Sequence, residues 1–90
     1  MENQIAVVTG GAQGIGLAVA RLLIQKGVLV ASWDIDPGNK DAMADLGSNA
    51  MAVDCKINDL ATVEAAYART CEAFGVPSIL INSAGISGPN

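Results

Sequence analysis

The chain has no histidine and only five basic residues, and each shortage argues against a class of function. Nine acidic residues against the five basic ones give a net charge of −4, which disfavours nucleic acid as a partner, since its phosphates attract basic surfaces. Without histidine, and with two cysteines that form no Cys-x-x-Cys pair, the chain offers few ligands for zinc. It also lacks any side chain whose ordinary pKa would make it a proton donor near neutrality.

Long apolar runs are also absent. The apolar stretches are strand-sized, far below the ~20 residues that cross a bilayer, so we expect no membrane partner. The segment Met1–Gln4 lacks the positive charge and apolar stretch of a secretory signal, which predicts a cytoplasmic protein. We therefore expect Cys55 and Cys71 to be reduced and buried.

What the chain does contain is enough apolar material for one small folded domain. Hydrophobic residues make up 51% and charged residues 16% of its 90 residues, a composition too apolar for a disordered chain. Short apolar runs alternate with helix-like segments, and runs that are apolar throughout indicate strands buried on both faces. The pattern predicts an α/β fold with a parallel sheet and helices on both sides. Strands are predicted at 5–9, 28–33, 49–53 and 79–81, and helices over about twelve residues from Ile15, over 39–46, and from a cap at Asn58 or Asp59 to Phe74.

The apolar residues of the last helix recur at helical spacing, and at two positions either of two residues can belong to the apolar face. Tyr67 is interpreted as core-facing, because it falls within this helix at an apolar position. The face consists of Leu60, Val63, Ala66 or Tyr67, Thr70 or Cys71, and Phe74.

A glycine-rich turn separates the first strand from the first helix. Gly10 permits a sharp turn, Gly14 lets backbone N–H groups approach a diphosphate, and Gly16 allows helix and strand to pack closely. The free N–H groups and positive dipole end of the helix favour an anion there. On spacing alone, a turn that only connects two elements remains an alternative. A P-loop is excluded, because Leu17 and Ala18 stand where its Lys-Ser/Thr pair would be.

Asp34 closes the second strand, 18 residues after Gly16. This is close to the offset of ~20 residues at which an acid reaches the adenosine ribose of a bound dinucleotide. A carboxylate there accepts hydrogen bonds from both ribose hydroxyls and repels a 2′-phosphate, so NAD is favoured over NADP. Asp36, two residues later, is a rival for this role, and a solvated acid at a turn is the structural alternative.

With these motifs in place, the chain resembles the N-terminal part of a short-chain dehydrogenase/reductase. That family's Thr-Gly-x-x-x-Gly-x-Gly turn is matched by Thr9, Gly10, Gly14 and Gly16, and its acid after the second strand by Asp34. The family's Asp that precedes a residue at the adenine pocket is matched by Asp54, and Cys55 stands where a small apolar residue is usual. Its Asn-Asn-Ala-Gly motif is matched, with serine as a mild departure in the second position, by Asn82, Ser83, Ala84 and Gly85.

The resemblance implies a Rossmann-like three-layer fold with strand order 3-2-1-4, ending after strand four. Gln13 stands where relatives that prefer NADP often carry a basic residue, which agrees with NAD. For Asp54 a turn acid, and for Asn82 a purely structural bridge between strands, are the alternatives. The resemblance assigns Gly14, Ile15 and Gly16 to the diphosphate, Asp34 and Ile35 to the adenosine ribose, Asp54 and Cys55 to the adenine, and Asn82, Ala84 and Gly85 to the nicotinamide-side ribose.

The family's catalytic Ser and Tyr-x-x-x-Lys lie beyond the Asn-Ala-Gly motif. Tyr67 does not match that motif, because Cys71 follows it where the motif has lysine, so Tyr67 is interpreted as non-catalytic. We therefore expect residues 1–90 to be a single partial domain that is inactive alone. The leading hypothesis is the NAD-binding half of an oxidoreductase that oxidises an alcohol or reduces a ketone. The alternatives are a free-standing nucleotide-binding module and an interaction protein that docks through the strand at 79–81. That strand is apolar and expected at a sheet edge, which predicts self-association and marginal stability.

Overall fold

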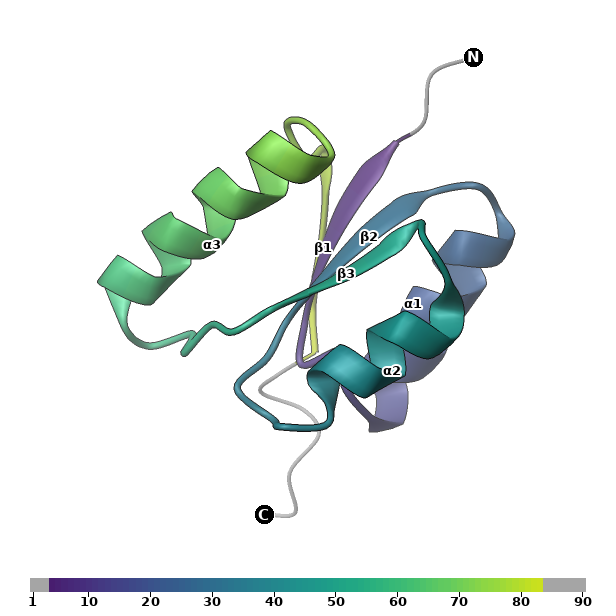
Figure 1. Cartoon of the computed structure of the whole chain (residues 1–90), viewed down its shortest axis with the longest axis horizontal. Coiled ribbons are helices and arrows are strands. Elements are labelled where there is room, and N and C mark those ends of the chain that lie inside the picture. The colour runs from purple at the N-terminus through teal and green to yellow at the C-terminus, as the bar shows by residue number, and fades with distance from the viewer. Residues whose placement is uncertain (1–3, 84–90) are drawn as a thin grey trace.

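A four-stranded parallel sheet forms the middle layer of the molecule (Figure 1). The computed structural model describes residues 4–83, and their strand order is β3-β2-β1-β4, as predicted. Helices α1 and α2 lie on one side of the sheet and α3 on the other (Figure 1). The elements are β1 (Ile5–Thr9), α1 (Gly14–Gln25), β2 (Leu29–Trp33), α2 (Asn39–Leu46), β3 (Ala50–Val53), α3 (Leu60–Ala73) and β4 (Ile79–Asn82).

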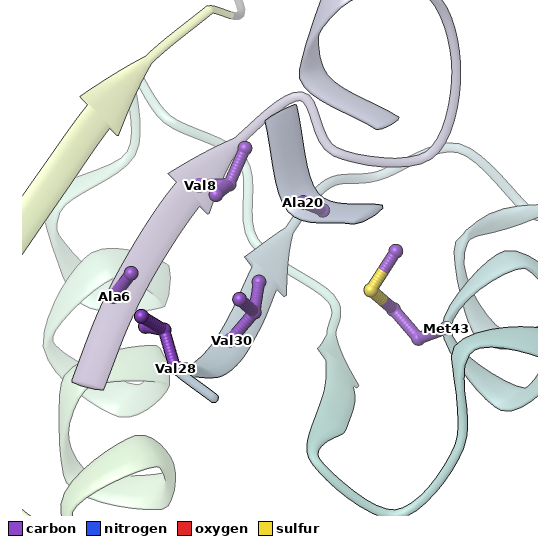
Figure 2. Close-up of a cluster of buried hydrophobic side chains, with 6 residues drawn as sticks. All are labelled: Ala6, Val8, Ala20, Val28, Val30 and Met43. Carbon is purple, nitrogen blue, oxygen red and sulfur yellow. The ribbon is translucent and has the colours of Figure 1, made fainter. Parts of the chain in front are cut away.

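Alternate side chains of β1, β2 and β3 enter two separate cores, because successive residues of a strand point to opposite faces. On the side of α1 and α2, Val8 and Val30 of the sheet face Ala20 of α1 and Met43 of α2 (Figure 2). On the other side, Val7, Ala31, Trp33, Val53, Cys55 and Ala66 form the second cluster. Both faces of the central strands are thus buried, which explains why these strands read as continuous apolar runs.

Local signals set the ends of the helices. Asp59 caps α3, its carboxylate accepting a hydrogen bond from the N–H of Ala61 at 3.1 Å. Gly27 follows α1 with φ of +87°, a left-handed conformation that glycine adopts without strain. Within residues 4–83, no helix is long and apolar enough to span a bilayer.

The prediction that Tyr67 faces the core is wrong. Ala66 and Thr70 of α3 are fully buried, whereas Tyr67 is 46% exposed and Leu60 is 70% exposed. One residue further along a helix turns the side chain by about 100°, so the positions next to Ala66 and Thr70 turn away from the sheet. Cys71, next to Thr70, is only half-buried for the same reason, so the prediction that both cysteines are buried holds for Cys55 alone. Both cysteines carry free thiols.

One face of β4 is uncovered among residues 4–83. Ile79 and Ile81 pack against the α1 and α2 core, but Leu80, on the opposite face, is 67% exposed. Leu80 borders a hollow of about 320 Å³ whose other walls include Val7 and Tyr67. The predicted edge position of this strand is confirmed for the described residues.

Candidate functional site

The glycine turn between β1 and α1 lies at the carboxyl ends of the parallel strands (Figure 1). Gly10 and Gly14 have φ of +72° and +62°, values that other residues adopt only at a cost. A Cβ placed on Gly14 would meet nothing within 4 Å, so the space above this residue is open. The turn therefore leaves room for a ligand directly over the start of α1.

The start of α1 is suited to an anion. Gln13, the N-cap residue, is extended, and its side chain makes no capping hydrogen bond. No acidic residue stands in the first turn of the helix. The first N–H groups of a helix have no partner within it and lie at the positive end of its dipole, which is the arrangement that binds phosphates. The residues present thus fit a diphosphate at this position.

Gly16 holds the helix against the end of β1. A Cβ at this position would clash with the carbonyl oxygen of Gly10 and with the Ser83 hydroxyl. The predicted role of Gly16 in close packing is therefore seen directly, and Ser83 is part of that packing. Gly11 is in a similar position, because a Cβ there would clash with the side chain of Ser32 on β2.

Asp34 is joined to the glycine turn by a hydrogen bond. Its Oδ2 accepts the backbone N–H of Ala12 at 3.1 Å, and its Oδ1 accepts the backbone N–H of Asp36 at 3.0 Å. A carboxylate has about four lone-pair positions, so each oxygen keeps capacity for another donor. The acid predicted for the ribose is thus fixed beside the predicted phosphate site, and it does not point into bulk water.

Asp36, the rival acid, also faces the glycine turn. Its Oδ2 accepts a hydrogen bond from Nε2 of Gln13 at 3.2 Å, and its Oδ1 accepts the N–H of Gly38 at 2.7 Å. The structure therefore brings Gln13, Asp34 and Asp36 together beside the glycine turn. Ile35, between the two acids, is 66% exposed and offers an apolar surface there.

The two residues that follow β3, Asp54 and Cys55, lie in different environments. Cys55 is buried against Val53 and Ala66, and this burial raises the pKa of its thiol, an effect opposed by a contact with the hydroxyl of Thr62. Asp54 is exposed and lines an open hollow over the edge strand, whose other walls include Lys40 and Arg69. The assignment of Asp54 and Cys55 to the adenine stays a prediction.

Asn82 forms a bridge between strands. Its Oδ1 accepts a hydrogen bond from the hydroxyl of Thr9 at 2.9 Å. Ser83 extends the bridge, because its hydroxyl donates to the carbonyl of Thr9 and its backbone N–H donates to the Thr9 hydroxyl at 3.2 Å. The structural alternative given for Asn82 is thus present in the molecule. Ala84 and Gly85, the other residues expected near the nicotinamide, lie outside the described residues.

Tyr67 has no feature of a proton donor. It is exposed on α3, and the neighbouring Cys71 thiol raises its pKa further above neutrality. A phenol that donates a proton near neutral pH needs a lowered pKa. The interpretation of Tyr67 as non-catalytic stays a prediction, and its expected burial is wrong.

The family model described as short chain dehydrogenase matches residues 4–90. The chain belongs to this family. Three relatives are 3-oxoacyl-[acyl-carrier-protein] reductase of Vibrio harveyi, 34% identical over 91 residues, momilactone A synthase of Oryza sativa subsp. japonica, 39% over 91, and cis-4-hydroxycyclohexanecarboxylate dehydrogenase of Sinomonas cyclohexanicum, 39% over 90. The alignments cover 100%, 99% and 97% of this chain but 37%, 33% and 36% of those proteins.

A solved structure agrees with the fold of this short-chain dehydrogenase chain. The 3-ketoacyl-(acyl-carrier-protein) reductase from Brucella melitensis, complexed with NADH, superposes with a TM-score of 0.85 at 31% sequence identity. The match covers 88% of this chain and 33% of that protein. The chain thus spans about a third of the length of the relatives it matches, and its Rossmann-like class is confirmed.

Proposed function

We propose that this chain binds NAD and supplies the cofactor-binding part of a short-chain dehydrogenase that oxidises an alcohol or reduces a ketone. The observation that carries the proposal is the hydrogen bond from Ala12 to the carboxylate of Asp34. This bond holds Asp34 beside the start of α1, which supports assigning Asp34 to the adenosine ribose and the helix terminus to the diphosphate. The NADH complex of the Brucella melitensis reductase supports the same class of ligand.

The described residues divide the binding task. The turn from Gly10 through Gln13, Gly14, Ile15 and Gly16 receives the diphosphate through backbone N–H groups, where no side chain obstructs it. Asp34 accepts hydrogen bonds from the ribose hydroxyls, and its negative charge favours NAD over NADP. Ile35 and the segment at Asp54 and Cys55 border the adenine, and Asn82 stands nearest the nicotinamide side.

The nicotinamide ring of the cofactor supplies the hydride chemistry. The chain's own part is to bind and orient the cofactor. The described residues hold Tyr67 as their single tyrosine, and its exposed position with a raised pKa gives it no role in proton transfer. We therefore expect residues 1–90 to bind NAD without turning over an alcohol or ketone.

Isothermal titration of the chain with NAD tests the proposal, using Asp34→Asn as the variant. Asparagine keeps the size of the side chain and an oxygen for the N–H of Ala12, but it loses the charge. Hydrogen bonds to a charged group contribute about 1.5–3 kcal/mol each, so the affinity should fall at least about tenfold. Asp45→Asn, an exposed acid at the far end of α2, is the matched control and should bind like the parent chain.

Absence of NAD binding by the parent chain would contradict the proposal, as would an Asp34→Asn variant that binds NAD as tightly as the parent. A second function has a specific observation behind it. The exposed face of β4 at Leu80 favours a docking role, and this reading predicts stable complexes that do not depend on NAD.

A further inference from the structure

We propose that Asp36 is a second specificity-determining residue of this site, which disfavours a nucleotide with a phosphate on the 2′ position of its adenosine ribose. The inference rests on the proposed NAD site and adds a residue to it. It concerns the charge of Asp36, apart from the ribose contacts assigned to Asp34.

The first step is the orientation of the Asp36 side chain. Both of its oxygens are engaged, Oδ2 by Gln13 at 3.2 Å and Oδ1 by the N–H of Gly38 at 2.7 Å. The backbone N–H of Asp36 donates to Asp34 Oδ1 at 3.0 Å. The carboxylate of the half-buried Asp36 is therefore held towards the glycine turn instead of moving freely in solvent.

The second step concerns the charges of the side chains around Asp36. Gln13 directly precedes Gly14, over which the space is open, so its bond to Asp36 links the ribose side of the site to the phosphate side. Gln13 is neutral and brings no charge to offset the two acids. Lys40, the basic residue nearest to Asp36 in the sequence, lines the hollow over β3 together with Asp54. A 2′-phosphate near Asp34 would thus face a second negative charge, and the side chain bonded to that charge, Gln13, is neutral.

The third step is the size of the effect. A phosphate monoester carries a charge of about −1.5 to −2 at neutral pH. For charges about 7 Å apart in a water-like dielectric, repulsion by one carboxylate weakens binding about threefold to sevenfold. The penalty is selective, because a ribose with a free 2′-hydroxyl carries no charge at this position.

The test is isothermal titration of the full chain with ADP-ribose and with its 2′-phosphorylated form, at about 0.01 M salt, where the Debye length is about 30 Å and screens the repulsion little. Asp36→Asn is the variant, because asparagine keeps an oxygen for the N–H of Gly38 while it removes the charge. Asp45→Asn removes the same charge at the far end of α2, about 9 Å along the helix from its start. We expect Asp36→Asn to bind the 2′-phosphorylated ligand about threefold to sevenfold more tightly, and to bind ADP-ribose within about twofold of the parent affinity.

The control should change neither affinity, and at about 1 M salt the gain of Asp36→Asn should fall below about twofold, because the Debye length shrinks to about 3 Å. If Asp34→Asn alters the ratio of the two affinities and Asp36→Asn does not, the inference about Asp36 is overturned while the NAD site stands. If the parent chain binds neither ligand, the proposed function itself fails and the inference with it. An equal gain for both ligands in Asp36→Asn would also overturn the inference, since charge repulsion at the 2′ position would then play no part.

Discussion

Replacing Gly16 with alanine tests whether the glycine turn and the sheet are packed as tightly as the structure indicates. In an ordinary helix, exchanging glycine for alanine stabilises by about 0.5–1 kcal/mol. Here the added Cβ would clash with the carbonyl oxygen of Gly10 and with the Ser83 hydroxyl. A backbone carbonyl cannot rotate aside as a side chain can, and overpacking of this kind costs about 1–3 kcal/mol.

At the upper end of that range, the clash exceeds the gain in helix propensity by about 2 kcal/mol. For a domain of this size each kcal/mol lowers Tm by about 4–8 °C, so we expect Gly16→Ala to melt about 8–16 °C below the parent chain. Thermal unfolding followed by circular dichroism measures this. A Tm equal to or above that of the parent would refute the packing argument, because helix propensity would then be the dominant effect.

A matched control separates loss of stability from damage to the site. Gly27→Ala forces alanine to φ of +87° at the end of α1, where a Cβ meets nothing within 4 Å. The left-handed conformation costs about 1–2 kcal/mol, a similar loss without any clash near the turn. Below its melting range, Gly27→Ala should bind NAD like the parent, whereas Gly16→Ala should bind it more weakly.

Three further predictions concern the α3 side of the sheet. Thr70→Val removes the acceptor of the buried Trp33 indole N–H, a hydrogen bond of 3.0 Å, and should lower the free energy of unfolding by about 1–3 kcal/mol in urea titrations, less when combined with Trp33→Phe. Burial raises the pKa of Cys55 in the folded state, so the folded chain keeps the thiol proton to higher pH than the unfolded chain does. The free energy of unfolding should therefore fall as pH rises above about 8.5. Cys55→Ala should remove this pH dependence and Cys71→Ala should leave it. Leu80→Lys should reduce self-association in sedimentation velocity, and an unchanged distribution would show that the β4 face is not the contact.

The fold was predictable because its signals are local. The apolar runs ending at Thr9 and Trp33 identify buried strands, Asp59 identifies the start of α3, and Gly27 the end of α1. Which face of a helix meets the sheet is decided by tertiary packing, and the spacing of apolar residues in α3 allows either Ala66 or Tyr67. The small side chain packs inward, since Ala66 is fully buried and Tyr67 is exposed.

The candidate site was predictable only in part. The glycine turn and Asp34 follow a known spacing, and the structure places them together. Three features have no signal in the local sequence: the bond from Gln13 to Asp36, the contact of Ser83 with the first strand, and the close approach of Gly11 to Ser32. Each joins residues 21 or more positions apart, and such pairs become neighbours only when the parallel sheet has assembled.

Mapping amide chemical shifts by NMR during a titration with ADP-ribose tests the central claim most directly. The account predicts that the largest shifts fall on the N–H groups of Ala12, Gly14, Ile15 and Gly16, with Asp34 and Asp36 beside them. Shifts gathered instead at Tyr67 and Leu80 around the hollow beside β4, or no shifts at millimolar ligand, would contradict it.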